Sequence, residues 1–183
     1  RVEYDAKFFD GTTSHWGLEV YSGDYMHAEH THYHENGQVN AISEADYNVP
    51  AGLIIYGSSE TYAANGTLTE KGWYRSVMDE TGVRLVQIGP WHKQFFDDGK
   101  PQRYAEYNDH GEYHGVVRLY DWDGNLQRET NYKNGIQDGL EFHYSTTGAL
   151  TYYQTFVNGV LHGLEEGFYE TGELKSVYYY SND

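Results

Sequence analysis

The sequence predicts an all-β protein, an elongated and twisted antiparallel meander of repeated β-hairpins. Three observations support this prediction: a repeat of 24 residues, dipeptides typical of tight turns, and the lack of any long stretch with helical spacing of apolar residues. Only 38% of the residues are apolar, and this fraction includes 20 tyrosines. Because tyrosine joins an apolar ring to a hydroxyl group that needs a polar partner, it suits half-buried surfaces. The composition therefore fits a thin sheet better than a globule with a dry centre.

The chain divides into an N-terminal segment and a repeat array. Residues 1–32 do not align with the repeat, and we expect them to form an irregular segment with β structure. Residues 33–183 contain about six repeat units, with an insertion at 75–88. Since no unit of this length buries an apolar face alone, neighbouring units must stack.

The first three units differ in regularity. The second keeps every spacing of the repeat, whereas the first and third are degenerate, and Pro101 replaces a leucine in the third. Their repeat positions are Tyr33, Gly37 and Val39; then Gly57, Tyr62, Gly66, Leu68 and Tyr74; then Phe95, Gly99 and Tyr107.

The last three units match in every repeat column. Each has a glycine, an aromatic residue, a turn glycine, a leucine and a second aromatic residue, at successive offsets of five, four, two and six residues. The members are Gly115, Tyr120, Gly124, Leu126 and Tyr132; Gly139, Tyr144, Gly148, Leu150 and Phe156; and Gly163, Phe168, Gly172, Leu174 and Tyr180.

Turn dipeptides identify these units as hairpins. Asp-Gly, Asn-Gly and Thr-Gly pairs separate runs rich in Tyr, Val, Thr and Phe. The Asn-Gly pairs supply the positive φ angles that tight hairpin turns need, and we interpret the recurring glycines as hairpin residues. Leu126 and Tyr132 are an even number of positions apart, so they share one face of a strand.

The order of these columns resembles the bacterial variant of the MORN repeat, found in YwqK-like antitoxin and immunity proteins. The resemblance covers about residues 57–183, and residues 33–56 more weakly. It implies a binding protein without catalytic residues, one that neutralises a toxin or secreted effector by direct contact.

Charge and composition restrict the partners. The 12 Lys and Arg against 28 Asp and Glu give a net charge of −16, which would repel nucleic acid and favour a basic partner. The absence of cysteine excludes disulfides and thiolate chemistry. No apolar run is long enough for a membrane-spanning helix. The Lys-poor, Tyr/Gly/Asn-rich composition slightly favours the periplasm with a leader removed; the cytoplasm is the alternative.

A histidine-rich stretch is a candidate metal site. His30, His32 and His34 would share one face if their segment is a strand, with imidazoles spaced for a divalent transition metal. Solvated strand histidines explain the same pattern, so we expect no metal here and no cofactor elsewhere.

Neighbouring carboxylates raise the question of glycosidase-like catalysis. The pairs are Asp97 with Asp98, Asp121 with Asp123, and Glu165 with Glu166. The four aspartates flank turn glycines, where aspartate is favoured for its hydrogen bonds to the backbone. We therefore expect no catalytic residues and no enzymatic activity.

Exposed aromatic and acidic residues remain as partner contacts. We expect them to contact a cognate toxin with a basic surface, because Trp and Tyr dominate interface energies and charge guides approach. Open sheet edges also allow homodimerisation. Two alternatives are a non-inhibitory protein scaffold and a carbohydrate-binding module. The predicted contact residues are Trp122, Glu141, Tyr152, Tyr153, Glu165 and Glu166.

Overall fold

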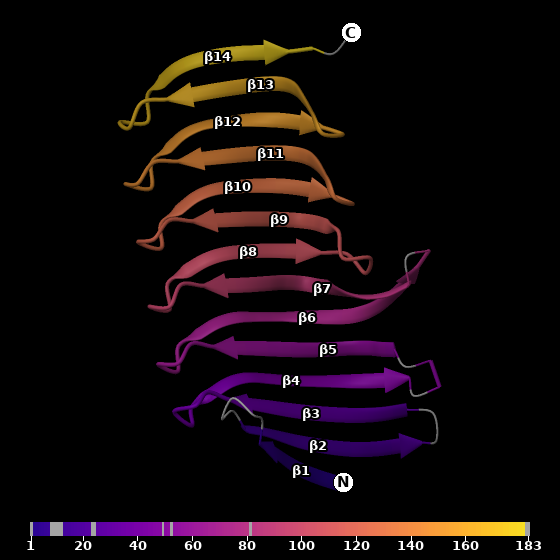
Figure 1. Cartoon of the computed structure of the whole chain (residues 1–183). Coiled ribbons are helices and arrows are strands. Elements are labelled where there is room, and N and C mark those ends of the chain that lie inside the picture. The colour runs from indigo at the N-terminus through magenta and orange to yellow at the C-terminus, as the bar shows by residue number, and fades with distance from the viewer. Residues whose placement is uncertain are drawn as a thin grey trace. The chain divides into compact units, whose positions relative to one another are not determined.

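The computed structural model describes residues 2–7, 13–22, 25–48, 50–51, 53–80 and 82–181. The chain divides into two compact units, residues 1–99 and 100–183. Unit 1 is an antiparallel meander in which each strand pairs with the next along the chain (Figure 1). Its strands are β1 (Val2–Lys7), β2 (Thr13–Ser22), β3 (Tyr25–Tyr33), β4 (Val39–Asn48), β5 (Leu53–Tyr62), β6 (Leu68–Asp79) and β7 (Gly82–Phe95).

Unit 2 repeats the same arrangement with strands of seven to nine residues. Consecutive strands again pair antiparallel in chain order (Figure 1). The strands are β8 (Pro101–Tyr107), β9 (Tyr113–Tyr120), β10 (Leu126–Lys133), β11 (Ile136–Tyr144), β12 (Leu150–Val157), β13 (Val160–Phe168) and β14 (Leu174–Tyr180). The predicted all-β antiparallel meander is confirmed, and the described residues contain no helix.

The Asn-Gly turns adopt the predicted backbone. Asn134 and Gly135 have φ values of 49° and 79°, and Asn158 and Gly159 have 50° and 81°. Two consecutive positive φ angles characterise the type I′ turn, whose twist matches that of the flanking strands. The predicted role of these dipeptides is therefore confirmed.

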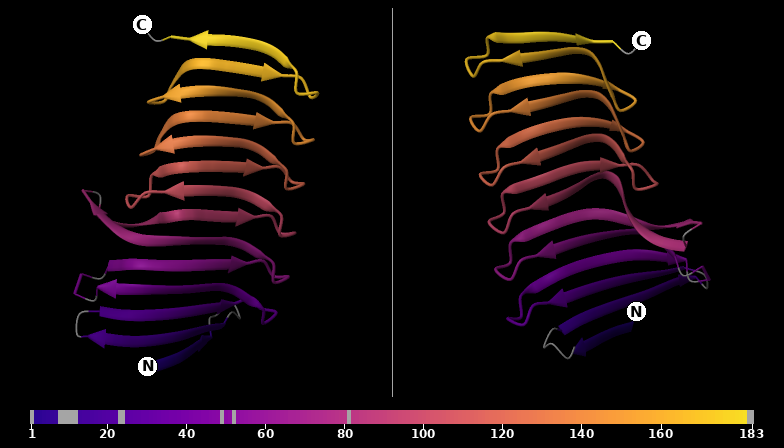
Figure 2. Two further views of the ribbon diagram at one scale, coloured as in Figure 1. Left: turned by 180° about the vertical axis from the view of Figure 1, so that it is seen from behind. Right: turned by 45° about the horizontal axis from the view of Figure 1, so that its top comes forward.

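The first glycine column has a different role from the one expected. Gly115, Gly139 and Gly163 all have positive φ, and each lies inside a strand at a point where the pairing register shifts by two residues. They are therefore bulge residues, and their interpretation as hairpin residues is wrong. Bulges bend a strand and increase its local twist. The strands of unit 2 curve along their length, as Figure 2 shows.

One face of unit 2 carries the most buried side chains. Residues that are directly opposite in antiparallel strands project to the same face, and one such row crosses the unit. The row consists of Ala105, Val117, Thr130, Glu141, Gln154, Glu165 and Tyr178. Its first four members are buried. Among the unit 1 side chains that the structure describes, those of Ala28, Ala45, Val86, Ile88 and His92 are buried.

We expect Asn158→Ala to lower the free energy of unfolding by about 1 kcal/mol, because a Cβ disfavours a left-handed backbone that asparagine tolerates. The backbone φ of Asn158 is 50°. Urea unfolding measures the change. Asn158→Gly should retain most of the stability, since glycine adopts this angle without a steric penalty. Equal losses in both variants would instead assign the effect to the asparagine side chain.

Candidate functional site

A cleft of about 570 Å³ lies over β12, β13 and β14 of unit 2. It brings together Tyr152 and Glu165, two of the six predicted contact residues. Its volume is in the range of pockets that hold a small ligand or one side chain of a partner. The lining residues are Thr151, Tyr152, Glu165, Gly167, Phe168, Tyr169, Glu170, Lys175 and Ser176.

Gly167 leaves a gap in a row that is otherwise filled by side chains. Gly167 stands in the same repeat column as Leu119 and His143, and these three residues follow one another at intervals of 24. The pairing register of the strands places all three on one face of the sheet. A Cβ at Gly167 would lie 2.5 Å from Ser176 Oγ and 3.9 Å from Thr151 O. Gly167 is not among the described residues with positive φ, so its backbone does not require glycine. The glycine therefore makes room for the hydroxyl of Ser176, and Gly167 itself is buried.

Tyr152 borders this gap. Its ring stacks on His143, with ring centroids 4.1 Å apart and an interplanar angle of 13°. Gly167 is the residue paired with Tyr152 on the other side, so the ring separates His143 from the gap. The pKa of Tyr152 is raised, chiefly by burial and then by the charges of Glu141 and Glu165, while Arg128 opposes the shift. This face of unit 2 is therefore polar and carries a tyrosine ring whose position is fixed. We use "cleft face" for the face of unit 2 that carries Glu141, Tyr152 and Glu165.

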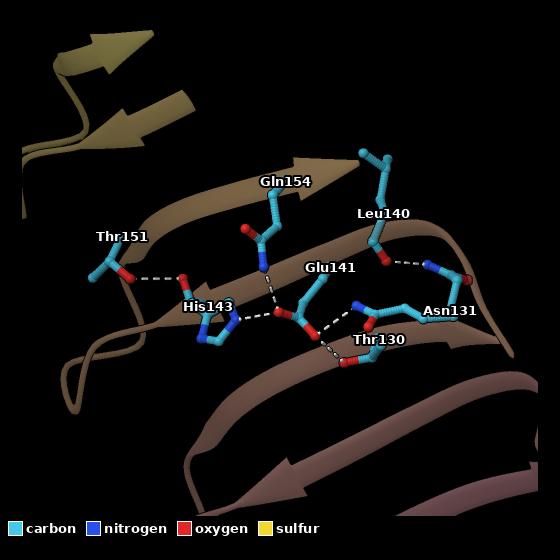
Figure 3. Close-up of polar contacts among 8 residues, drawn as sticks. Thr130, Asn131, Leu140, Glu141, His143, Thr151 and Gln154 are labelled. Carbon is cyan, nitrogen blue, oxygen red and sulfur yellow. Dashed lines mark hydrogen bonds and ion pairs between the residues drawn. The ribbon is translucent and has the colours of Figure 1, made fainter. Parts of the chain in front are cut away.

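Glu141 fixes His143 and is itself buried. Its Oε1 accepts hydrogen bonds from His143 Nε2 at 2.7 Å and Gln154 Nε2 at 2.8 Å (Figure 3). Its Oε2 accepts from Thr130 Oγ1 and Gln137 Nε2, both at 2.9 Å. Burial alone would raise the pKa of Glu141, but the bonds from His143, Gln154 and Thr130 outweigh it and lower the pKa.

The expectation that Glu141 is exposed is wrong. Only 7% of its surface is accessible, because four donors on β10, β11 and β12 surround the carboxylate. Glu141 holds His143, and His143 supports the ring of Tyr152. Glu141 thus positions the wall of the cleft and does not line it.

Glu165 occupies the repeat column of Glu141, 24 residues later, and it does line the cleft. It accepts a hydrogen bond from the hydroxyl of Tyr180. The pKa of Tyr180 is raised by burial and then by this bond and the carboxylate charge. Glu170 adds a second carboxylate to the lining, and Lys175 adds one cation. Lys175 Nζ lies 5.6 Å from the centroid of the Tyr169 ring.

Tyr153 and Glu166 lie on the opposite face. Adjacent residues of a strand project to opposite sides of a sheet, and Tyr153 pairs with Glu166. Tyr153 donates a hydrogen bond to Glu166, which raises its pKa. Its ring lies between those of Phe142 and Phe168, at centroid distances of 6.0 and 6.2 Å. The six predicted contacts therefore do not form one surface.

Trp122 lies in the turn between β9 and β10, outside the cleft. It is exposed as predicted, with 77% of its surface accessible. Lys100 Nζ donates to its backbone oxygen at 3.3 Å. In the same turn, Asp121 Oδ1 accepts from the backbone N–H groups of Asp123 and Asn125, both at 2.9 Å. These bonds, the one from Asn125 foremost, lower the pKa of Asp121. The turn interpretation of Asp121 is thereby confirmed.

The three predicted metal-site histidines do not converge. His30 and His32 meet edge to face on β3, with ring centroids 4.0 Å apart. The pKa of His30 is lowered by burial and then by His32. β3 ends before His34, so the expectation of one shared strand face is wrong for this residue. Its Nε2 lies 2.9 Å from Tyr62 O, and its Nδ1 3.1 Å from Asn40 Nδ2. No group of three potential metal ligands occurs among the described residues.

Several residues of the site were not predicted. Gly167, Ser176 and Lys175 form the floor and one side of the cleft, and His143 supports its wall. The sequence holds one signal for the floor, which is a glycine in a column that holds leucine and histidine in the two preceding units. It holds no comparable signal for Ser176 or Lys175.

Comparison with known proteins supports the repeat assignment. Three stretches match the model of the MORN repeat variant, residues 26–45, 113–134 and 161–182. The last of these includes β13 and β14, which form much of the cleft. The comparison with curated proteins finds no match.

One solved structure with a weak likeness is a porin-like protein from Bacteroides uniformis. The similarity covers 91% of this chain and 64% of that one, with 10% identity and a TM-score of 0.22. The chain thus spans 64% of that protein's length. In the described part of the chain, no helix has the length and apolarity needed to cross a membrane.

Proposed function

We propose that this chain is a repeat-built binding protein that neutralises a cognate toxin or secreted effector by covering its active site. The MORN-variant matches favour a scaffold for protein binding. The observation that carries the proposal is the cleft face, where Tyr152 and Glu165 line one concave surface. Tyrosine is among the residues enriched in interface hot spots, and a carboxylate adds charge complementarity to a basic partner.

The charge of the chain favours a basic partner. A net charge of −16 attracts a basic protein and speeds its association, an effect that salt weakens. A basic active-site surface, such as that of an enzyme acting on nucleic acid or another polyanion, fits this requirement. Covering such a surface inhibits the enzyme without chemistry in the inhibitor.

Co-expression with the product of the neighbouring gene tests the proposal. We expect the chain to restore growth of cells that express this product, and the two proteins to co-purify. Glu165→Lys should weaken the complex at least about tenfold, because it reverses a charge in the contact surface. Isothermal titration calorimetry of the purified pair measures this change.

Glu166→Lys is the matched control. Glu165 and Glu166 are adjacent, and each accepts a hydrogen bond from a tyrosine, but they lie on opposite faces. We expect Glu166→Lys to change the affinity less than threefold. Co-purification without growth rescue would instead support a non-inhibitory scaffold. Glycan binding without any protein partner would support a carbohydrate-binding module.

A further inference from the structure

We propose that the cleft over β12–β14 accepts an arginine side chain of the partner, with its guanidinium group against the Tyr152 ring and beside the Glu165 carboxylate. This inference rests on the proposed function, because it specifies which group of a basic protein the cleft face recognises. Three features of the cleft carry it: small residues at its bottom, a flat ring at its side, and an excess of negative charge.

The gap is specific to this repeat unit. Where Gly167 stands, the two preceding units carry Leu119 and His143, so the fold accommodates side chains in this column. The backbone of Gly167 does not require glycine either. Gly167 is buried, with the hydroxyl of Ser176 where a Cβ would stand, so two small residues lie at the bottom of the cleft next to Tyr152.

The ring of Tyr152 is held flat at the side of this gap. His143 covers one face of the ring at 4.1 Å, and the Glu141 carboxylate holds His143 at 2.7 Å. A ring that is fixed before binding loses little conformational entropy when a partner stacks on it. A planar guanidinium group can stack on the flat ring, whereas a compact ammonium group cannot, so the ring favours arginine over lysine.

The charges in the lining favour a cation. Glu165 and Glu170 contribute two carboxylates, against the single ammonium group of Lys175. Lys175 lies over the ring of Tyr169, so the cleft already contains one cation held by an aromatic ring. Tyr152 and Glu165 both line the cleft, from the neighbouring strands β12 and β13, and the charge of Glu165 contributes to the raised pKa of Tyr152. A guanidinium group satisfies both, because it stacks on rings and forms paired hydrogen bonds with carboxylates.

Nuclear magnetic resonance titration of the full chain tests this inference without the partner. The probe is N-acetyl-L-arginine amide, and the control probe is the citrulline analogue, which has nearly the same shape and no charge. We expect the arginine probe to shift the amide signals of Tyr152, Gly167 and Ser176, with a dissociation constant on the order of millimolar. The citrulline probe should bind at least about fivefold more weakly.

Variants locate the binding. Glu165→Gln and Gly167→Ala should each weaken the arginine probe at least about fivefold, the first by removing the charge and the second because its Cβ displaces the Ser176 hydroxyl into the cleft. Glu166→Gln, on the opposite face, should change its affinity less than twofold. Well-dispersed spectra confirm that each variant is folded. If Gly167→Ala unfolds, Tyr152→Leu takes its place, because this substitution removes the ring on which the guanidinium group stacks and should also weaken binding.

The outcomes separate this inference from the proposed function. Equal binding of both probes, signal shifts outside the cleft, or insensitivity to Glu165→Gln would overturn the arginine site, even if the chain rescues cells from the toxin. Arginine binding in the cleft together with a failed rescue would leave the site standing and overturn the proposed function.

Discussion

Glu141→Ala is expected to lower the free energy of unfolding by about 2–4 kcal/mol. The substitution removes the acceptor for four donors, from Thr130, Gln137, His143 and Gln154, in a place where little water reaches. A buried donor without a partner costs about 1–3 kcal/mol, and part of this loss is recovered as the side chains move. Urea unfolding followed by circular dichroism measures the change.

Glu165→Ala is the matched control for this prediction. Glu165 stands in the same repeat column, but it is only half-buried and lines the open cleft. We expect its loss to cost less than about 1 kcal/mol, because water replaces the carboxylate as a hydrogen-bond partner. Equal effects of the two variants would show that the network around Glu141 adds nothing beyond an ordinary surface carboxylate.

Acid should remove the contribution of Glu141. The pKa of this carboxyl is lower in the folded chain than its ordinary value of 4.5, because the hydrogen bonds stabilise the ionised form more than burial disfavours it. The resulting stability is fully present above pH 4.5 and is lost as the pH falls through the folded pKa. Below pH 4.5, the stability difference between the wild type and Glu141→Gln should therefore narrow. A difference that grows on acidification would contradict this assignment.

The meander was predictable because its determinants are local. Asn134 with Gly135, and Asn158 with Gly159, define turns from two residues each, and the repeat shows where strands recur. The alternation of side chains between the two faces of a strand could also be predicted from the sequence. Tyr152 and Tyr153 are adjacent on a strand, so their separation onto opposite faces follows from strand geometry alone.

The cleft was not predictable because it depends on a bulge. Phe156 pairs with Leu161, and continuing this register along the hairpin would place Tyr152 opposite Glu165. The bulge at Gly163 adds two residues to β13, so that Tyr152 pairs with Gly167 instead. In the sequence, a glycine that forms a bulge looks the same as a glycine that forms a turn. The neighbours of Tyr152 therefore required the structure.

The burial of Glu141 has a similar cause. Its donors come from three strands, and Gln137 reaches it from its own strand across the bulge at Gly139. A single charged residue in a strand is usually predicted to be solvent-exposed, because buried charges are rare. Only the paired register of Thr130, Glu141 and Gln154 shows that polar partners are available on both sides.

Gly115→Ala is the second substitution with a large expected effect, a loss of about 3–4 kcal/mol in the free energy of unfolding. Two costs combine at this bulge. The φ of Gly115 is 112°, an angle that alanine adopts only with strain. In addition, the new Cβ would lie 1.9 Å from Glu106 Oε2 and 3.1 Å from Glu106 Cβ. The carboxylate must move away, which breaks its hydrogen bonds from Val116 N at 2.8 Å and Tyr104 Oη at 2.7 Å.

Gly139→Ala separates the two costs. Gly139 has the same φ of 112°. A Cβ added at Gly139 would lie 3.1 Å from Asn131 Cβ, as one at Gly115 would lie 3.1 Å from Glu106 Cβ. At Gly139, however, no carboxylate oxygen occupies the position of the new Cβ. We expect this variant to lose only the strain energy, about 2 kcal/mol. The difference between the two variants therefore measures what the contacts of Glu106 contribute.

Tyr104 gives an independent readout of the same displacement. Burial and then the hydrogen bond to Glu106 raise the pKa of Tyr104 to about 12. In Gly115→Ala the bond is broken while burial persists, so nuclear magnetic resonance titration of carbon-13-labelled tyrosine, which resolves Tyr104 from the other tyrosines, should show this pKa falling part of the way toward 10. Gly139→Ala should leave the titration unchanged, because it does not touch Glu106. A destabilised Gly115→Ala with an unshifted Tyr104 would mean that Glu106 keeps its bonds, and backbone strain alone would then account for the loss.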